Sequence, residues 1–259
     1  MTKRALKRMV REGAFDSAQF EDDGKIRRLP VDRGGWSPVN QHGQRDDDRE
    51  QGYVKTIKPK SAGQSQLIEA IDNKNLVMAL GPAGTGKTYL AIAKAVEALE
   101  AGKVGRIVLS RPAVEAGESI GYLPGDMEDK LAPYLRPLYD ALSDRLSMKR
   151  VRALMAEGAI EIAPVGYMRG RTLNNAFVVI DEAQNCTYVQ LKMLLTRLGW
   201  HSTMVVTGDP HQSDLLPGVS GLAEVAEKFD PVENIAVVRL ADRDIVRHPL
   251  VAEMLGVLT

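Results

Sequence analysis

The feature that most constrains this chain is a glycine-rich run between an apolar segment and a helical pattern. Residues 75–81 read NLVMALG, which is typical of a short buried strand, and residues 88–102 show helical apolar spacing that ends at Gly102. Between them, residues 81–88 read GPAGTGKT and match the full G-x-x-x-x-G-K-[ST] pattern. There the backbone N–H groups can surround phosphates, and the helix N-terminus favours negative charge. The sequence therefore predicts a phosphate-binding loop at a strand end.

The positions of this loop have separate expected roles. Lys87 is expected to reach the β- and γ-phosphates of a nucleotide, and Thr88 is expected to bind Mg²⁺. The predicted nucleotide-binding residues of the loop and the first helical turn are Gly81, Pro82, Ala83, Gly84, Thr85, Gly86, Lys87, Thr88 and Tyr89.

A second strand end carries an acidic pair. Residues 177–185 read FVVIDEAQN, in which four apolar residues lead into Asp181 and Glu182. Asp181 is predicted to hold the magnesium shell, and Glu182 is predicted to act as the base that polarises an attacking water. Such a pair is common by chance, but downstream of a phosphate-binding loop it favours hydrolysis over nucleotide binding alone.

Two glutamines are further candidates. Gln212 follows the strand-like run 203–209, and its amide could contact both the γ-phosphate and the water, or serve only as a turn residue. Ahead of the phosphate-binding loop, the amide of Gln64 or Gln66 could recognise an adenine edge, and a solvated helix start is the alternative.

The order of the segments predicts an α/β fold. Helical patterns alternate with strand-like runs, which implies a mostly parallel sheet covered by helices on both faces. Residues 1–60 are polar and lack a sustained period, so they are predicted to form an extended arm or linker ahead of a domain at 61–259. The strand-like runs after the loop lie at 106–110, 159–165, 177–181, 203–209 and 234–240.

Charge and cysteine content limit the expected partners and the expected cellular compartment. The 34 basic and 34 acidic residues balance, so binding of nucleic acid must come from local patches. The single Cys186 allows no internal disulfide and fits a reducing compartment. No segment reads as a signal peptide or a membrane span, so the expectation is a cytoplasmic protein without a membrane partner.

Taken together, Gln64, GPAGTGKT, IDEAQ and TGDPHQ resemble the ATPase core of superfamily 1 helicases. Eight blocks are similar, in order, to the PhoH family of ATPases: SRPAVEAGESIGYLPGD, PYLRPLYDAL, YMRGRTL, IDEAQN, LTRLG, VVTGDPHQSDL, PGVSGL and DIVRHPLV. The resemblance covers roughly residues 60 to 255. It implies a single RecA-like domain that binds ATP with Mg²⁺, often in hexameric rings. The first 60 residues are too short for the nuclease-type PIN domain of some relatives.

A single RecA-like domain implies that a neighbouring subunit completes the site. An arginine supplied in trans can stabilise charge on the transferred phosphoryl group. Arg197 and Arg247 are favoured because they lie in blocks that match the family, although each could be a surface ion pair instead. The other candidates are Arg169, Arg171 and Arg243.

Two functions remain open. The motif order favours an ATPase coupled to binding or unwinding of RNA or single-stranded DNA. The alternative is a regulatory or protein-remodelling ATPase without translocation, and a small-molecule kinase is disfavoured by Gln212. The loop RPAVEAGESIGYLPGDM starts at Arg111 on the expected active-site edge, where it could contact nucleic acid or support a subunit interface. A broken helix is expected over DKLAPYLRPLYDAL.

Overall fold

The computed structural model describes residues 57–112, 127–246, 250 and 254. Residues 1–56, which make up most of the predicted arm, and the loop residues 113–126 lie outside this part of the chain. Ile57, the first described residue, packs against the core, and the predicted boundary at residue 61 stays a prediction.

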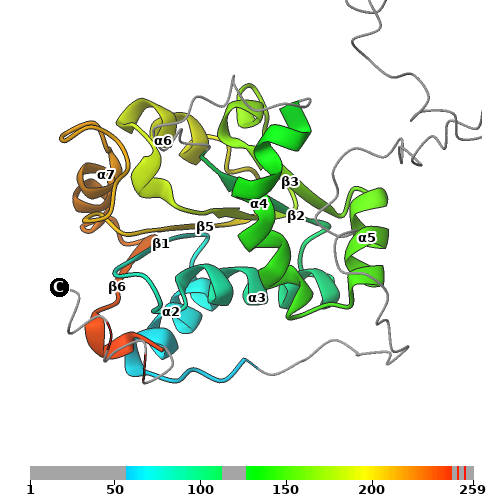
Figure 1. Ribbon diagram of the computed structural model, residues 1–259, viewed down its shortest axis with the longest axis horizontal. Helices are drawn as coiled ribbons and strands as arrows, with labels where there is room; N and C mark the ends of the chain where they lie inside the picture. The colour runs from blue at the N-terminus through cyan, green and yellow to red at the C-terminus, as the bar shows by residue number, and fades with distance from the viewer. Residues whose placement is uncertain (1–56, 113–126, 247–249, 251–253, 255–259) are drawn as a thin grey trace, which may run out of the picture. The chain divides into compact units, whose positions relative to one another are not determined.

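The centre of the molecule is a six-stranded sheet in the order β3-β2-β4-β5-β1-β6, and every neighbouring pair is parallel (Figure 1). All five residues of β1 and of β4 are buried, because helices cover both faces of these inner strands. The apolar runs in the sequence therefore predicted each strand correctly. The strands are β1 (Leu76–Leu80), β2 (Arg106–Arg111), β3 (Ile160–Pro164), β4 (Ala176–Ile180), β5 (Thr203–Gly208) and β6 (Ile235–Arg239).

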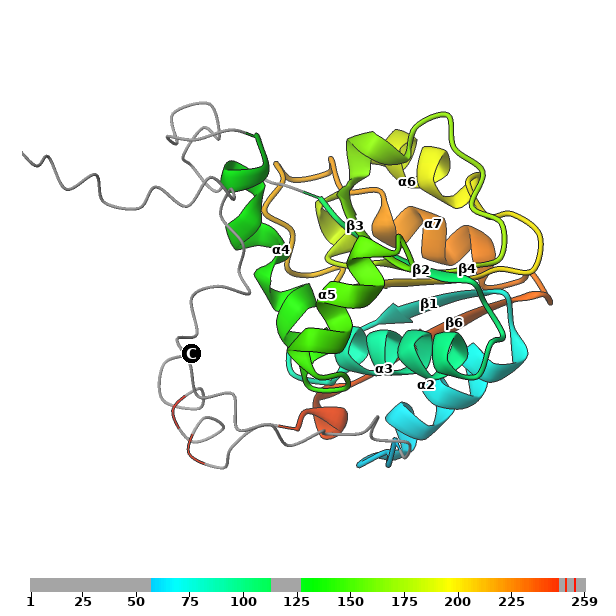
Figure 2. The ribbon, with the colours of Figure 1, turned by 90° about the vertical axis from the view of Figure 1, so that its right-hand side faces the viewer.

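Helices pack against both faces of the sheet and bury two separate apolar clusters (Figure 2). One face carries α2 (Ala62–Asn73), α3 (Lys87–Glu100), α4 (Met127–Ser143) and α5 (Met148–Ala156). The other carries α6 (Tyr188–Leu195), α7 (Leu222–Phe229) and the short 3-10 helix η4 (Val165–Met168). Two further 3-10 helices among the described residues are η5 (Ala183–Asn185) and η6 (Asp242–Asp244). The predicted α/β fold, with a parallel sheet between two helical layers, is confirmed.

One helix differs from its prediction. The segment with Pro133 and Pro137 was expected to form a broken helix, but α4 runs without interruption from Met127 to Ser143. Leu138 and Leu142 lie one turn apart and are fully buried in the core. Their packing against the sheet outweighs the loss of backbone hydrogen bonds at the two prolines.

Parallel pairing gathers the loops that follow four neighbouring strands. Strands β2, β4, β5 and β1 lie side by side, so their carboxyl ends meet at one edge of the sheet. The phosphate-binding loop follows β1, and the acidic pair follows β4. No helix in the described part of the chain is both long and apolar enough to cross a lipid bilayer.

Asp244 ties the segment after β6 to the start of α2. Its buried carboxylate accepts hydrogen bonds from the backbone N–H of Ala241 at 2.9 Å and of Gly63 at 3.2 Å. The Ala241 bond and the Ser61 hydroxyl lower the pKa of Asp244. Because the folded pKa lies below the unfolded value, ionised Asp244 stabilises the fold above the unfolded pKa, and that contribution is lost as the pH falls through the folded pKa.

We therefore expect Asp244→Asn to lower the free energy of unfolding by about 1 to 3 kcal/mol at pH 7. The difference from the native chain should shrink as the pH falls below about 4, the ordinary pKa of an unfolded aspartate, and toward the lower folded pKa. Urea denaturation at pH 7 and pH 3 measures both effects. Asp242→Asn, a change at an exposed position of the same 3-10 helix, is the control. A pH-independent difference would contradict the assignment.

Candidate nucleotide site

The phosphate-binding loop has the backbone that its glycines predict. Gly81, Gly84 and Gly86 have φ values of 140°, 86° and 86°, a region that favours glycine. A Cβ atom on Gly81 would lie 2.3 Å from the carbonyl oxygen of Leu240, so this position also lacks room for a side chain. Gly86 is the N-cap of α3, and the helix N-terminus therefore points its free N–H groups into the loop.

Lys87 lies inside this loop. Its ammonium group donates hydrogen bonds to the carbonyl oxygens of Gly81 at 2.6 Å and Pro82 at 2.8 Å. Burial lowers the pKa of Lys87, and the nearby carboxylates of Asp209, Glu182 and Asp181 partly offset this effect. The side chain is thus a nearly buried cation beside the space that phosphates would fill.

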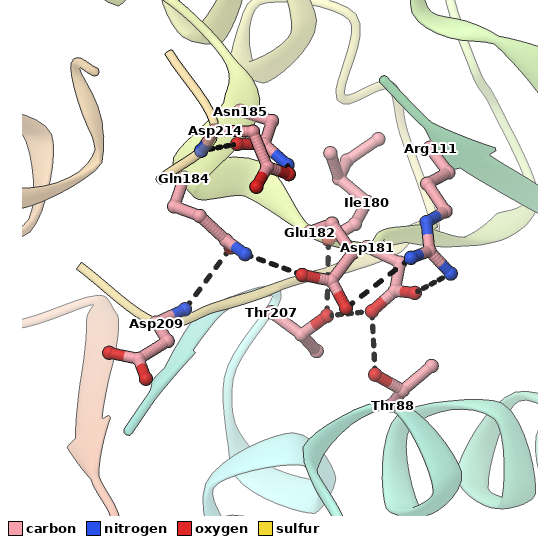
Figure 3. A network of polar contacts seen from close by, with 10 residues as sticks. All are labelled: Thr88, Arg111, Ile180, Asp181, Glu182, Gln184, Asn185, Thr207, Asp209 and Asp214. Atoms are coloured by element: carbon pink, nitrogen blue, oxygen red, sulfur yellow. Dashed lines mark hydrogen bonds and ion pairs between the residues drawn. The ribbon is translucent and has the colours of Figure 1, made fainter. Parts of the chain in front are cut away.

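Thr88 and Asp181 meet at the predicted metal position (Figure 3). The Thr88 hydroxyl donates to Oδ1 of Asp181 at 2.6 Å, and the Thr207 hydroxyl donates to the same oxygen at 2.7 Å. A hydroxyl oxygen and a buried carboxylate are hard ligands of the kind that Mg²⁺ prefers. These two residues therefore fit a magnesium ion that takes its other ligands from phosphates and water.

Glu182 has a backbone conformation that is rare outside glycine. Its φ is 51° and its ψ is 42°, directly after the buried strand β4. A side-chain amide N–H of Gln184 donates to Oε2 of Glu182, while Oε1 of the same amide accepts from the backbone N–H of Asp209 at 3.1 Å. The strained turn and the Gln184 amide together aim the Glu182 carboxylate toward the loop after β5.

A cavity of about 490 Å³ joins these groups, a size that suits a nucleotide. Gly81, Pro82 and Thr85 of the predicted loop do not line it, and the Thr85 hydroxyl donates to the Pro82 carbonyl oxygen at 2.8 Å. The predicted residues that line the cavity are Gln64, Ala83, Gly84, Gly86, Lys87, Thr88, Tyr89, Asp181, Glu182 and Gln212.

The two glutamine predictions meet different surroundings. Gln64 is buried, and its amide donates to the Thr85 carbonyl at 3.0 Å and accepts from the Lys60 N–H at 2.8 Å. One N–H and one lone pair of that amide remain for a base, so adenine recognition stays a prediction. Gln212 is exposed at the cavity, and its backbone N–H donates to the Asp209 carbonyl at 3.1 Å. Its role as a γ-phosphate sensor also stays a prediction.

Two of the candidate arginines are held by contacts outside this site. Arg171 forms a two-pronged ion pair with Glu161, with one branch at 2.6 Å. Arg197 donates to the backbone carbonyls of Met193 and Arg171, each at 3.0 Å. Because the Arg197 carbonyl pairs with the N–H of Leu173, just ahead of β4, it lies at the opposite edge of the sheet from its own phosphate-binding loop. A role in a neighbouring subunit stays a prediction for Arg197.

The other three arginine candidates are less constrained. Arg169 and Arg243 are exposed. Arg247 lies outside the described residues, although the N–H of its neighbour Val246 donates to the Gly84 carbonyl at 2.9 Å.

Four groups at the site were missed as individual candidates. Gln184 holds Glu182, and Lys58 and Lys60 line the cavity. Arg111 was expected at this edge of the sheet but was given no role toward the acidic pair, with which it forms ion contacts. A signal for Gln184 was present, because it lies two residues after the predicted base in the same strand-end loop.

Comparisons with known proteins place the chain in a family. The family model described as PhoH-like protein matches residues 56–259. The chain is 54% identical over 202 residues to the PhoH-like protein of Bacillus subtilis, which covers 78% of this chain and 63% of that protein. It is 41% identical over 251 residues to Protein PhoH of Escherichia coli K12, which covers 96% of this chain and 69% of that protein.

A solved structure was also similar at lower identity. The large terminase of a thermophilic bacteriophage is 14% identical, with a TM-score of 0.47, over 78% of this chain and 51% of that chain. Among the sequence relatives, the chain spans less than two thirds of the length of the Bacillus subtilis protein, so it corresponds to a part of that relative.

Proposed function

This chain belongs to the PhoH-like protein family and has the fold of a P-loop NTPase, and from that premise we propose that it hydrolyses ATP with Mg²⁺. One observation carries the proposal: Thr88 bonded to Asp181, with Glu182 the next residue, on the wall of the cavity that Lys87 also lines. A site that only bound nucleotide would need no base beside the metal position.

The residues then divide the work among them. Lys87 exchanges its loop carbonyls for the β- and γ-phosphates, which offer a charged acceptor in place of neutral ones. Thr88 and Asp181 hold the metal, which neutralises charge on the phosphates when bound. Glu182, held by Gln184, accepts the proton of the attacking water.

Side-chain contacts connect the γ-phosphate end of the site to the loop after β5. Gln212 lies on the loop after β5, and Asp209 on that loop is bonded to Gln184, which holds Glu182. A movement of Glu182 would therefore be passed through the hydrogen bonds of Gln184 to the loop after β5. We assign Gln212 the role of sensing whether the γ-phosphate is present.

The coupled substrate is proposed from the order of the motifs, which resembles that of superfamily 1 helicases. We propose that the ATPase binds RNA or single-stranded DNA and acts as a cytoplasmic ring, with a hexamer as the favoured state. A single RecA-like sheet supports this assembly, because Arg197 is held at the edge opposite its own phosphate-binding loop and could act on a phosphate only in a neighbouring subunit. Size-exclusion chromatography with light scattering tests the ring.

We expect single-stranded RNA or DNA to raise the ATPase rate. A strand bound at the sheet edge next to the site would favour the arrangement of the site that hydrolyses ATP. The measurement is ATP hydrolysis at low salt with no strand, with RNA and with DNA, since phosphate contacts weaken as salt rises. Double-stranded DNA of equal length is the control. An unchanged rate together with no binding of either strand would overturn nucleic-acid coupling and favour the protein-remodelling alternative.

A further inference from the structure

Arg111 is a charged side chain that contacts both members of the acidic pair. It is the last residue of β2, which lies directly beside β4 in the sheet. One guanidinium nitrogen lies 3.7 Å from Oδ2 of Asp181, and the other lies 3.6 Å from Oε1 of Glu182 (Figure 3). Its side chain is only 22% exposed, so water screens these contacts incompletely.

The guanidinium contacts the carboxylates from outside the cavity that they line. Among the described residues, those that line the cavity include Asp181 and Glu182 but not Arg111. In Figure 3, Gln184 and Arg111 lie on opposite sides of Glu182, so the carboxylate is held between an amide and a cation. This placement favours an action on the carboxylates over a direct contact with phosphate.

The charge arrangement matters because two carboxylates on neighbouring residues attract divalent cations. Protein side chains supply few ligands at this position: Thr88 and Asp181 are bonded to each other, and no group of three or more His, Cys, Asp or Glu suited to a metal occurs in the part of the chain that the structure describes. Mg²⁺ takes about six oxygen ligands, so most must come from phosphates and water. A fixed cation behind the pair weakens its attraction for a metal that arrives without phosphates.

We propose that Arg111 is a positioning residue that neutralises Asp181 and Glu182 from behind, so that the site takes up its divalent cation together with a nucleotide and not ahead of it. This inference rests on the proposed function, because it assumes that the cavity binds a nucleotide with a metal. It concerns the order of binding and does not require hydrolysis.

The test uses Mg²⁺ alone on the nucleotide-free chain. Isothermal titration should show Mg²⁺ binding to Arg111→Gln about tenfold more tightly than to the native chain, because one positive charge is removed beside the carboxylates. Arg111→Lys keeps the charge and should return the affinity toward the native value. Asp181→Asn added to Arg111→Gln should remove the gain, which locates the ion. Arg106→Gln removes a like charge from the other end of β2, about 17 Å away, and is the matched control.

A second measurement is the factor by which saturating Mg²⁺ tightens ADP binding. Phosphates supply most ligands of the nucleotide-bound ion, so Arg111 should influence its affinity less than that of the free ion. Because coupling between two ligands is reciprocal, that factor should then fall in Arg111→Gln and recover in Arg111→Lys. Loss of packing alone would lower ADP affinity with and without the metal and leave the factor unchanged. Equal Mg²⁺ affinity in Arg111→Gln and the native chain, or an unchanged factor, would overturn the proposal.

The folding of the variant is checked by circular dichroism. Arg111→Met, which keeps the apolar stem of the side chain, is the second neutral variant. If neither neutral variant folds, Arg111 is needed for the fold itself and the proposal fails. If Mg²⁺ binding changes as expected but no variant or native chain hydrolyses ATP, the proposed function fails while this inference stands.

Discussion

Lys87→Ala should abolish measurable ATP turnover, with a fall of at least about 100-fold, the scale for removing one donor aimed at developing charge. The Lys87 ammonium group lies on the cavity wall and is bonded to loop carbonyls that phosphate oxygens can replace. Without it, the β- and γ-phosphates lose their single charged side-chain partner in the loop GPAGTGKT. ATP affinity should fall as well, because the lost hydrogen bonds are charge-assisted.

The measurement pairs steady-state ATP hydrolysis with ATP binding by titration calorimetry. Lys103→Ala, an exposed lysine after the end of α3, removes the same atoms and charge far from the loop and should keep the native rate. Turnover by Lys87→Ala within a few-fold of the native chain would show that the phosphates do not bind in this loop.

The residues that could be predicted from sequence are those whose position follows from strand order alone. Five apolar residues in β1 and in β4 mark inner parallel strands, which are buried on both faces. Once the sheet is parallel, residues that follow its strands share one edge, so Lys87 after β1 and Asp181 after β4 reach the same edge although β5 lies between these strands. The positions of these residues after apolar runs in the sequence are enough to predict that they share this edge.

What could not be predicted depends on side-chain direction and on contacts between distant segments. Arg111 meets the acidic pair because β2 pairs with β4 and not with β1, and several sheet orders were compatible with the sequence. Asp244 caps the start of α2 across 181 residues of chain, which no local pattern signals. The unbroken helix α4 depends on burial of Leu138 and Leu142, which local proline rules do not include.

The position of Gln184 could be predicted from the sequence, but its contacts could not. Its place in the sequence IDEAQ puts it near the base, but its function depends on a three-way contact with Glu182 and the backbone of Asp209. A Cβ atom on Gly208 would lie 2.6 Å from Cδ2 of Leu222 and 2.7 Å from Oε1 of Gln184. The residue before Asp209 therefore lies close to the side chain that holds Glu182 and to the start of α7.

Glu182→Gln should separate nucleotide binding from hydrolysis. The amide has almost the same shape as the carboxylate and can accept from Gln184, but it cannot take a proton from water at neutral pH. We expect a fall in turnover of about 10² to 10⁴, the range for a positioned general base, with ATP affinity within a few-fold of native. Single-turnover hydrolysis and ATP titration on the same preparation measure the two effects.

Comparison with Lys87→Ala separates the two roles, because Lys87→Ala should lower ATP affinity and Glu182→Gln should leave it unchanged. Glu227→Gln, an exposed glutamate on α7, is the matched control and should keep the native rate. Rapid hydrolysis by Glu182→Gln would move the base elsewhere. Asp209 would then be the next candidate, since it is buried, follows the neighbouring strand β5 and lines the same cavity. Loss of ATP binding in Glu182→Gln would instead mean that the strained turn at φ 51° depends on the carboxylate and its contact with Arg111.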